Sequence, residues 1–211
     1  MRTAIILGLG ILFAICGMVF KLDNRRLIRS VTLTHILFLG LTVFAILLAT
    51  VDWGFRGPYT ERIIASIWFG TGIALFGLYR KGKAKRILKV YSGLYFWTIP
   101  ILTIAWFIPR LHFAAAVFGL GIIIDGEFNR YPIDNTFQVQ TSRQGMLSGC
   151  PSLSIVESKF IFFEKVTDNF VELSECYEKI EPSRISNDSI RMILTFTDSE
   201  IIDTTLYLPR K

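Results

Sequence analysis

Long apolar stretches separated by short basic loops constrain the fold of this chain more than any other feature. The first stretch, residues 3–20, contains 18 uncharged residues, and further apolar runs cover residues 31–51, 63–79 and 90–108. About 20 apolar residues in a helix cross a bilayer core of about 30 Å. The sequence therefore predicts an integral membrane α-helical bundle with at least four spans.

A shorter fifth run decides between two versions of this bundle. Residues 111–124 follow a Pro109-Arg110 break and comprise 14 apolar residues. At about 1.5 Å per residue they reach only about 21 Å as a helix, so a full crossing needs a locally thin bilayer or snorkelling ends. We favour five spans, with four spans plus a re-entrant segment as the alternative.

The first apolar run could alternatively be a signal peptide. Arg2 precedes the apolar stretch, and Ala14-Ile15-Cys16 resembles the cleavage site of a signal peptide. However, Lys21, Arg25, Arg26 and Arg29 follow at once, and a basic cluster resists translocation. We therefore expect a retained helix.

Charge is distributed unevenly along the chain. Residues 1–124 carry 14 Lys/Arg and only 3 Asp/Glu, a balance of +11, whereas residues 125–211 carry 9 Lys/Arg and 14 Asp/Glu, a balance of −5. The basic residues lie in short loops, where the positive-inside rule explains them better than nucleic-acid binding. This rule predicts a cytoplasmic side for both basic loops and an outer side for residues 52–62. The residues expected to set topology and to contact lipid headgroups are Arg25, Arg26, Arg29, Arg80, Lys81, Lys83, Lys85 and Arg86.

The pattern changes to strands after residue 124, so we divide the chain into a membrane bundle, 1–124, and a small acidic, mainly-β domain, 125–211. Residues 136–140 alternate polar and apolar side chains, which is typical of a half-buried strand. Turn-forming residues at 167–169 and 197–199 separate neighbouring strand candidates, as hairpins require. We expect five or six antiparallel strands in a sheet or small open barrel, formed from residues 136–140, 152–157, 159–166, 170–177, 189–196 and 201–208, with longer loops at 142–149 and 178–188.

Two features bear on how this domain meets the membrane. The connection at residues 125–132 is short, which keeps the domain near the membrane surface. The apolar run Phe160-Ile161-Phe162-Phe163 could fill the domain core or lie against the bilayer. We favour the core.

Small residues recur at helical spacing in three of the apolar runs. Such stripes let helix backbones approach closely. They predict packing within the bundle, or alternatively a contact between copies, through Gly10, Ala14, Ser66, Gly70, Ala74, Ala115 and Gly119.

Residues for catalysis or metal binding are scarce. His35 and His112 are the only histidines, and the three cysteines, Cys16, Cys150 and Cys176, form no metal-binding spacing. His35 is the single titratable candidate inside a span, and we expect it to bond a backbone carbonyl or a headgroup rather than to conduct protons. We expect no catalytic residue, no metal and no cofactor.

These observations predict a non-enzymatic polytopic membrane protein whose C-terminal β domain binds a partner or regulates an assembly. The expected partners are membrane lipids and a protein, which could be a second copy of this chain. The alternative is a small oligomeric transporter or channel component. Five spans would place the β domain in the cytoplasm, where the thiols of Cys150 and Cys176 stay reduced.

Overall fold

The computed structural model describes residues 2–20, 24–81, 85–111, 113, 127–143, 152–171, 177–186, 189–196 and 201–207. The chain forms two compact units. Unit 1 contains Met1–Leu47 and Tyr59–Asp125, and unit 2 contains Leu48–Pro58 and Gly126–Lys211. Residues 48–58, which the sequence analysis assigned to the membrane bundle, thus belong to the second unit.

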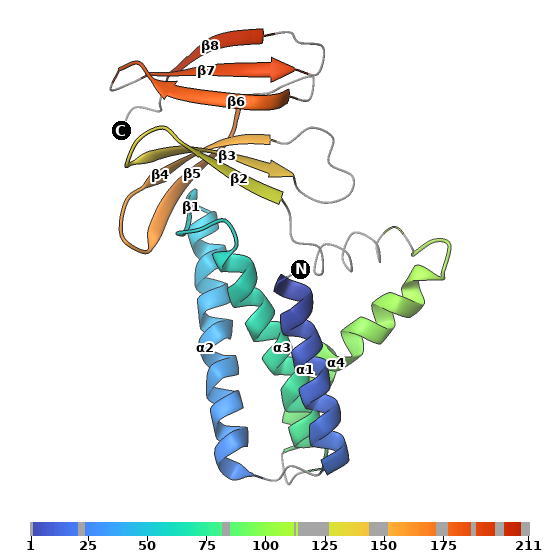
Figure 1. Cartoon of the computed structure of the whole chain (residues 1–211). Coiled ribbons are helices and arrows are strands. Elements are labelled where there is room, and N and C mark those ends of the chain that lie inside the picture. The colour runs from blue at the N-terminus through green and yellow to red at the C-terminus, as the bar shows by residue number, and fades with distance from the viewer. Residues whose placement is uncertain are drawn as a thin grey trace. The chain divides into compact units, whose positions relative to one another are not determined.

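Unit 1 is built on four helices, each long and apolar enough to cross a membrane (Figure 1). They are α1 (Arg2–Phe20), α2 (Arg25–Ala49), α3 (Thr60–Lys81) and α4 (Arg86–Trp106). At the start of α2 the Asn24 side chain accepts the backbone N–H groups of Arg26 (3.0 Å) and Leu27 (3.3 Å). This N-cap satisfies two donors that the helix itself leaves without partners.

Helices α1 and α3 pack through small residues. A Cβ added at Gly10 would lie 2.7 Å from the carbonyl oxygen of Gly70, and one added at Gly77 would overlap the backbone of Ala14. Only glycine lets two helix backbones come this close. The side chains that fill the remaining space, Leu7 and Ile73, are 5% and 0% exposed.

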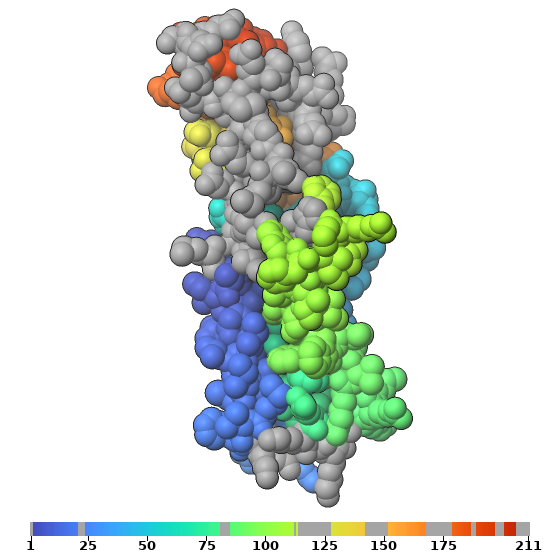
Figure 2. All heavy atoms as spheres, turned by 90° about the vertical axis from the view of Figure 1, so that its right-hand side faces the viewer, coloured from blue at the N-terminus to red at the C-terminus, as the bar shows by residue number. Residues whose placement is uncertain are grey.

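Other described residues bury a smaller share of α2 and α4 than of α1 and α3. Pro100 lies inside α4, which diverges from α3 toward its C-terminal end (Figure 1). Large apolar side chains on α4, the green helix facing the viewer in Figure 2, remain exposed, and they include Leu94, Trp97, Ile101 and Ile104. Such surfaces suit the hydrocarbon core of a bilayer, where no hydrophobic force drives helices together.

The fifth span is not among the membrane-length helices found in the described residues. Of residues 111–124 only Leu111 and Phe113 are described. The remainder of this segment, with Ala115 and Gly119, lies outside the described residues, as do Cys150 and Cys176.

Unit 2 contains two antiparallel sheets (Figure 1). The first has the order β1-β5-β4-β3-β2 and the second the order β6-β7-β8. The strands are β1 (Trp53–Phe55), β2 (Glu127–Pro132), β3 (Phe137–Arg143), β4 (Ser152–Ser158), β5 (Phe163–Val171), β6 (Tyr177–Arg184), β7 (Ser189–Phe196) and β8 (Ile201–Tyr207). The two sheets share a core that includes Val139, Leu153, Met192 and Leu194, each no more than 1% exposed. The described strands form no barrel.

Several strand assignments from the sequence were wrong. The predicted loop at 178–188 contains β6, and β2 occupies most of the predicted connection at 125–132. The predicted turn at 167–169 lies within β5. There the pairing with β4 shifts from Ile155↔Thr167 to Leu153↔Val171, so the turn-forming residues are accommodated by an irregularity in the strand rather than by a chain reversal.

Candidate functional site

The connection between α2 and α3 supplies a strand to the first sheet of unit 2. The three residues of β1 lie opposite residues 163–165 of β5 in antiparallel register. On either side of this pairing, the Val166 N–H donates to the Asp52 carbonyl at 2.8 Å and the Arg56 N–H donates to the Phe162 carbonyl at 2.9 Å. A segment joining two apolar helices is therefore an edge strand of the β domain.

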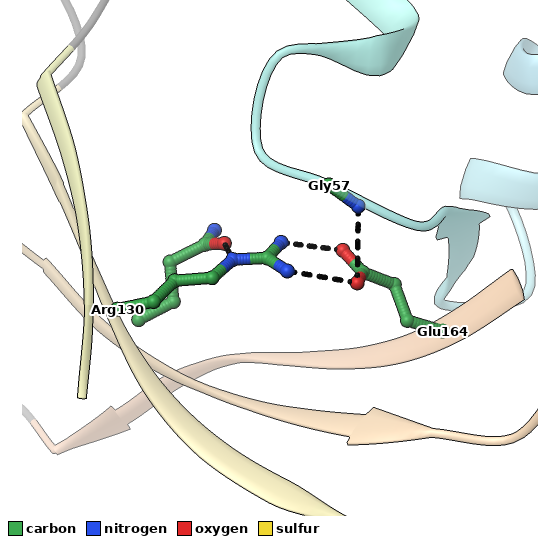
Figure 3. A network of polar contacts seen from close by, with 4 residues as sticks. Gly57, Arg130 and Glu164 are labelled. Atoms are coloured by element: carbon green, nitrogen blue, oxygen red, sulfur yellow. Dashed lines mark hydrogen bonds and ion pairs between the residues drawn. The ribbon is translucent and has the colours of Figure 1, made fainter. Parts of the chain in front are cut away.

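Figure 3 shows an ion pair between Arg130 of β2 and Glu164 of β5, next to the α2–α3 connection. The Arg130 guanidinium donates from both terminal nitrogens to the Glu164 carboxylate, at 3.0 and 2.6 Å, and its Nε donates to the Gln140 Oε1 at 2.8 Å. The Glu164 and Arg130 side chains are only 4% and 18% exposed. Two parallel bonds to a carboxylate fix the orientation of both groups.

The same carboxylate also holds the α2–α3 connection. The Gly57 N–H donates to Glu164 Oε2 at 3.3 Å. Gly57 has φ 108°, a backbone conformation that favours glycine. Glu164 therefore ties β5 to β2 through Arg130 and to the connection through Gly57. We call Gly57, Arg130, Gln140 and Glu164 the Glu164 clamp.

A second electrostatic contact links the two sheets. Asp134 Oδ1 accepts the backbone N–H groups of Thr136 and Phe137, both at 2.7 Å, and Oδ2 pairs with Arg184 at the end of β6. Partial burial opposes ionisation of this carboxyl, but the two N–H groups and the guanidinium outweigh it and leave the pKa of Asp134 below its usual range. Asp134 is thus a charged cap for the β2–β3 turn.

The turn between β4 and β5 exposes three consecutive large apolar residues. Phe160, Ile161 and Phe162 are 64%, 76% and 70% exposed. The expectation that this run fills the core was therefore wrong for these three residues, which we call the β4–β5 tip. Only Phe163 enters a strand, where its ring stacks on Phe55 at 5.7 Å.

The second sheet ends at β8, which among the described strands pairs only with β7. Ile201 and Ile202 at its start are 64% and 41% exposed. Asp203, the one charged residue of β8, is bonded to Arg191 on β7 at 2.6 Å. An edge strand with exposed isoleucines is a template for another strand unless charge or proline blocks it.

In unit 1 a polar cluster joins three helices. His35 of α2 is 2% exposed. Its Nδ1 lies 3.1 Å from both the Trp68 carbonyl and the Thr71 hydroxyl of α3, and its Nε2 lies 2.7 Å from the Tyr91 hydroxyl of α4. The Tyr91 and Tyr95 hydroxyls are 2.8 Å apart.

The partners of His35 assign its tautomer. The Trp68 carbonyl can only accept, so Nδ1 carries a proton, and a neutral imidazole then accepts the Tyr91 O–H at Nε2. Tyr95 completes the chain by donating to Tyr91. His35 therefore bonds a backbone carbonyl, as expected from the sequence, but it does so between helices rather than at a headgroup.

The predicted packing residues fall into two groups. Gly10 and Ala14 of α1 are buried, and so are Ser66, Gly70 and Ala74 of α3. Gly10 lies against Gly70, as described above, and the Ser66 hydroxyl bonds the Arg62 carbonyl of its own helix at 2.6 Å. Gly77, which the sequence analysis did not name, makes the closest approach to α1. The other two predicted residues lie outside the described part of the chain.

Those predicted basic residues that the structure describes lie at helix ends. Arg25, Arg26 and Arg29 are exposed in the first turns of α2, and Lys85 and Arg86 are exposed at the start of α4. The Arg80 guanidinium lies 5.7 Å from the centre of the Phe76 ring. The Lys81 side chain and the whole of Lys83 are not described.

No protein-family model matches this chain, and neither a curated protein nor a solved structure shows significant similarity to it. Within the described residues, no group of three or more His, Cys, Asp or Glu side chains is placed to hold a metal ion. The candidate functional features of the described residues are the Glu164 clamp, the β4–β5 tip, the β8 edge and the His35 cluster.

Sequence reasoning missed Arg130, Glu164, Tyr91 and Tyr95. A signal for the tyrosines existed, because Tyr91 and Tyr95 are spaced i, i+4 in an apolar run and so share one helix face. Arg130 and Glu164 are 34 residues apart and belong to no motif.

Proposed function

We propose that this protein is a non-enzymatic, four-span membrane protein that displays its β domain on the outer side of the membrane as a partner-binding module. The pairing of β1 with β5 carries the assignment of sides. Only α3 and α4 separate these strands among the described helices of membrane length. Two crossings return the chain to the same side, so both strands can join one sheet.

A crossing by residues 111–124 would put β1 and β5 on opposite sides of the bilayer. We therefore favour four spans, and the β domain follows the α2–α3 connection rather than lying in the cytoplasm. The exposed Arg25, Arg26 and Arg29 at one end of α2 support a cytoplasmic location for that end. The connection, at the other end of α2, is then outside.

The binding surface we propose is the free edge of β8. Its partner would be an extended segment of another protein that adds a strand, using backbone hydrogen bonds for affinity and contacts with Ile201 and Ile202 for specificity. The Arg191–Asp203 pair leaves the edge without an unpaired charge to repel such a strand.

Proline substitution tests this edge with a built-in control. In an antiparallel pair, successive residues point their N–H and C=O groups alternately toward the neighbouring strand and away from it. Of Thr204→Pro and Thr205→Pro, one therefore removes a bond to β7 and destabilises the domain. The other removes a donor from the free edge and leaves the domain folded.

A photo-crosslinking residue in place of Ile201 captures the bound partner as a covalent adduct in living cells. We expect a protein adduct that is lost in the proline variant whose thermal stability is unchanged. A residue of the same kind at the exposed Ile185, in the turn after β6, should not give that adduct. An adduct insensitive to both prolines, or none at all, would contradict binding at this edge.

One observation favours a second function, that of a small transporter or channel component. The chain Tyr95–Tyr91–His35–Trp68 connects α4, α2 and α3 through hydrogen bonds inside the membrane-length helices. Buried ionisable residues in spans commonly mark proton or ion pathways. A pH-sensitive dye trapped in proteoliposomes tests this function. Proton flux that is present in the natural protein and abolished by His35→Phe would support it, whereas no flux above that of empty liposomes would leave His35 as a structural contact.

A further inference from the structure

The β4–β5 tip is the most concentrated apolar surface that the described part of unit 2 exposes. Phe160, Ile161 and Phe162 follow one another in a tight turn, closed by bonds from the N–H groups of Lys159 and Phe160 to the Phe163 carbonyl at 3.3 and 3.2 Å. The turn is therefore held in shape while its side chains point away from the core. Exposed apolar residues are ordinary singly but not as a contiguous group.

The tip also contacts the connection between α2 and α3. The Phe162 carbonyl accepts the Arg56 N–H at 2.9 Å, and the Phe160 ring stacks on Trp53 at 6.1 Å with an interplanar angle of 29°. Trp53 lies four residues after the end of α2, and Arg56 lies four residues before the start of α3. Four residues span at most about 14 Å.

Short stretches of chain therefore keep Trp53 and Arg56, the two residues that contact the tip, within about 14 Å of the ends of α2 and α3. We propose that the β4–β5 tip, together with Trp53, inserts into the interfacial region of the protein's own bilayer, so that the partner of this surface is lipid. Phe and Trp side chains are favourable there, and Trp is enriched at this depth in membrane proteins. Removing large apolar side chains from water is favourable, so the three residues of the tip together favour its insertion.

The residues at the base of the tip limit how deeply it enters. Glu157 and Lys159 form an ion pair immediately before Phe160, and both side chains are about one-fifth exposed. An ion pair is costly to carry into hydrocarbon. The tip therefore inserts shallowly, with this pair at the headgroup level, and attaches the β domain to the bilayer in addition to its chain connections to α2, α3 and α4.

Lipid-quenching experiments on the full-length protein in nanodiscs test the insertion. A fluorescent amino acid replaces Ile161, and the bilayer contains lipids with a nitroxide near the headgroup. The matched control carries the same amino acid at Ile185, another exposed isoleucine in a tight turn of the same unit, which is 55% exposed against 76% for Ile161. We expect quenching several-fold stronger at position 161, together with protection from aqueous iodide there.

Equal quenching at the two positions, or equal access of iodide, would overturn the proposal. Nanodiscs that hold a single copy of the protein show whether lipid or a second copy covers the tip. Protection of position 161 from iodide that appears only with two copies per disc would mean that the tip is a contact between copies. A second variant, Phe162→Ser with the fluorophore at 161, keeps the test informative. It should reduce the lipid quenching while the melting temperature of the protein stays unchanged.

Discussion

Replacing Arg130 with methionine should destabilise the β domain strongly, because it leaves the Glu164 carboxylate buried without its cation. Removing one partner of a buried ion pair costs about 3–5 kcal/mol. The Arg130 side chain is 18% exposed, so water can reach part of the site, and we expect the lower end, about 3 kcal/mol. With a urea m-value of about 1–2 kcal/mol/M for a domain of this size, the unfolding midpoint should fall by about 1.5–3 M.

A second substitution separates the charge from the shape of the site. Arg130→Met combined with Glu164→Gln removes the buried charge but keeps an acceptor for the Gly57 N–H. The double variant should recover at least half of the lost stability, since contacting residues are not additive. Lys179→Met serves as a control. Both side chains of the Lys179–Glu181 pair are exposed, and surface ion pairs contribute little to the free energy of unfolding.

Pulse proteolysis of the full-length protein in mild detergent, at a series of urea concentrations, measures these midpoints. The variants should also let protease cut within residues 50–58 at lower urea than in the natural protein, because the clamp holds that segment. An unchanged midpoint in Arg130→Met, or a double variant as unstable as the single one, would refute the argument that Glu164 is ionised and buried against its partner.

Three further predictions concern other parts of the structure. Gly77→Ala should lower the thermal stability of unit 1 by about 1–3 kcal/mol, because its Cβ meets the Ala14 backbone, whereas Gly8→Ala has open space and should be neutral or slightly stabilising. His35→Leu should loosen α2 by about 1–2 kcal/mol and Tyr91→Phe by less, as unfolding in a denaturing detergent would show; equal effects would contradict the hydrogen-bond chain. Since the pKa of Asp134 is lowered in the folded state, its contribution is present above the unfolded-state pKa of about 3.9 and is lost as pH falls through the folded-state pKa. Asp134→Asn should therefore flatten the acid end of the stability profile, and an unaltered profile would show that the charge contributes nothing.

The sequence predicted the membrane-length helices well because their signal is local. Each apolar run is long, bounded by charge and hydrophobic on all sides, so composition alone identifies it. Antiparallel sheets in the C-terminal part were also predicted from alternation and turn residues. The sequence did not predict β6 because Pro182 and the charged residues of this strand are typical of a loop. The strand lies at a sheet edge, however, where proline is tolerated.

The candidate site could not be predicted because its parts meet only in the fold. β1 is three residues long within a segment rich in turn formers, and its partner strand begins more than 100 residues later. No periodicity extends over three residues. The β4–β5 tip was wrongly predicted to fill the core, because an apolar run between strands normally belongs to the core. Only the register of β4 with β5 shows that this run forms the turn.

The measurement that tests the account most directly asks whether the α2–α3 connection and the β domain lie on the same side of the membrane. Single cysteines replace Arg56, Lys179 and Lys85, all exposed, in a background in which the native cysteines are serine. An impermeant thiol reagent is then applied to intact cells. The account predicts that positions 56 and 179 are labelled and that position 85 reacts only after permeabilisation. Opposite behaviour of positions 56 and 179 would contradict it, because β1 could not then be a strand of the β domain.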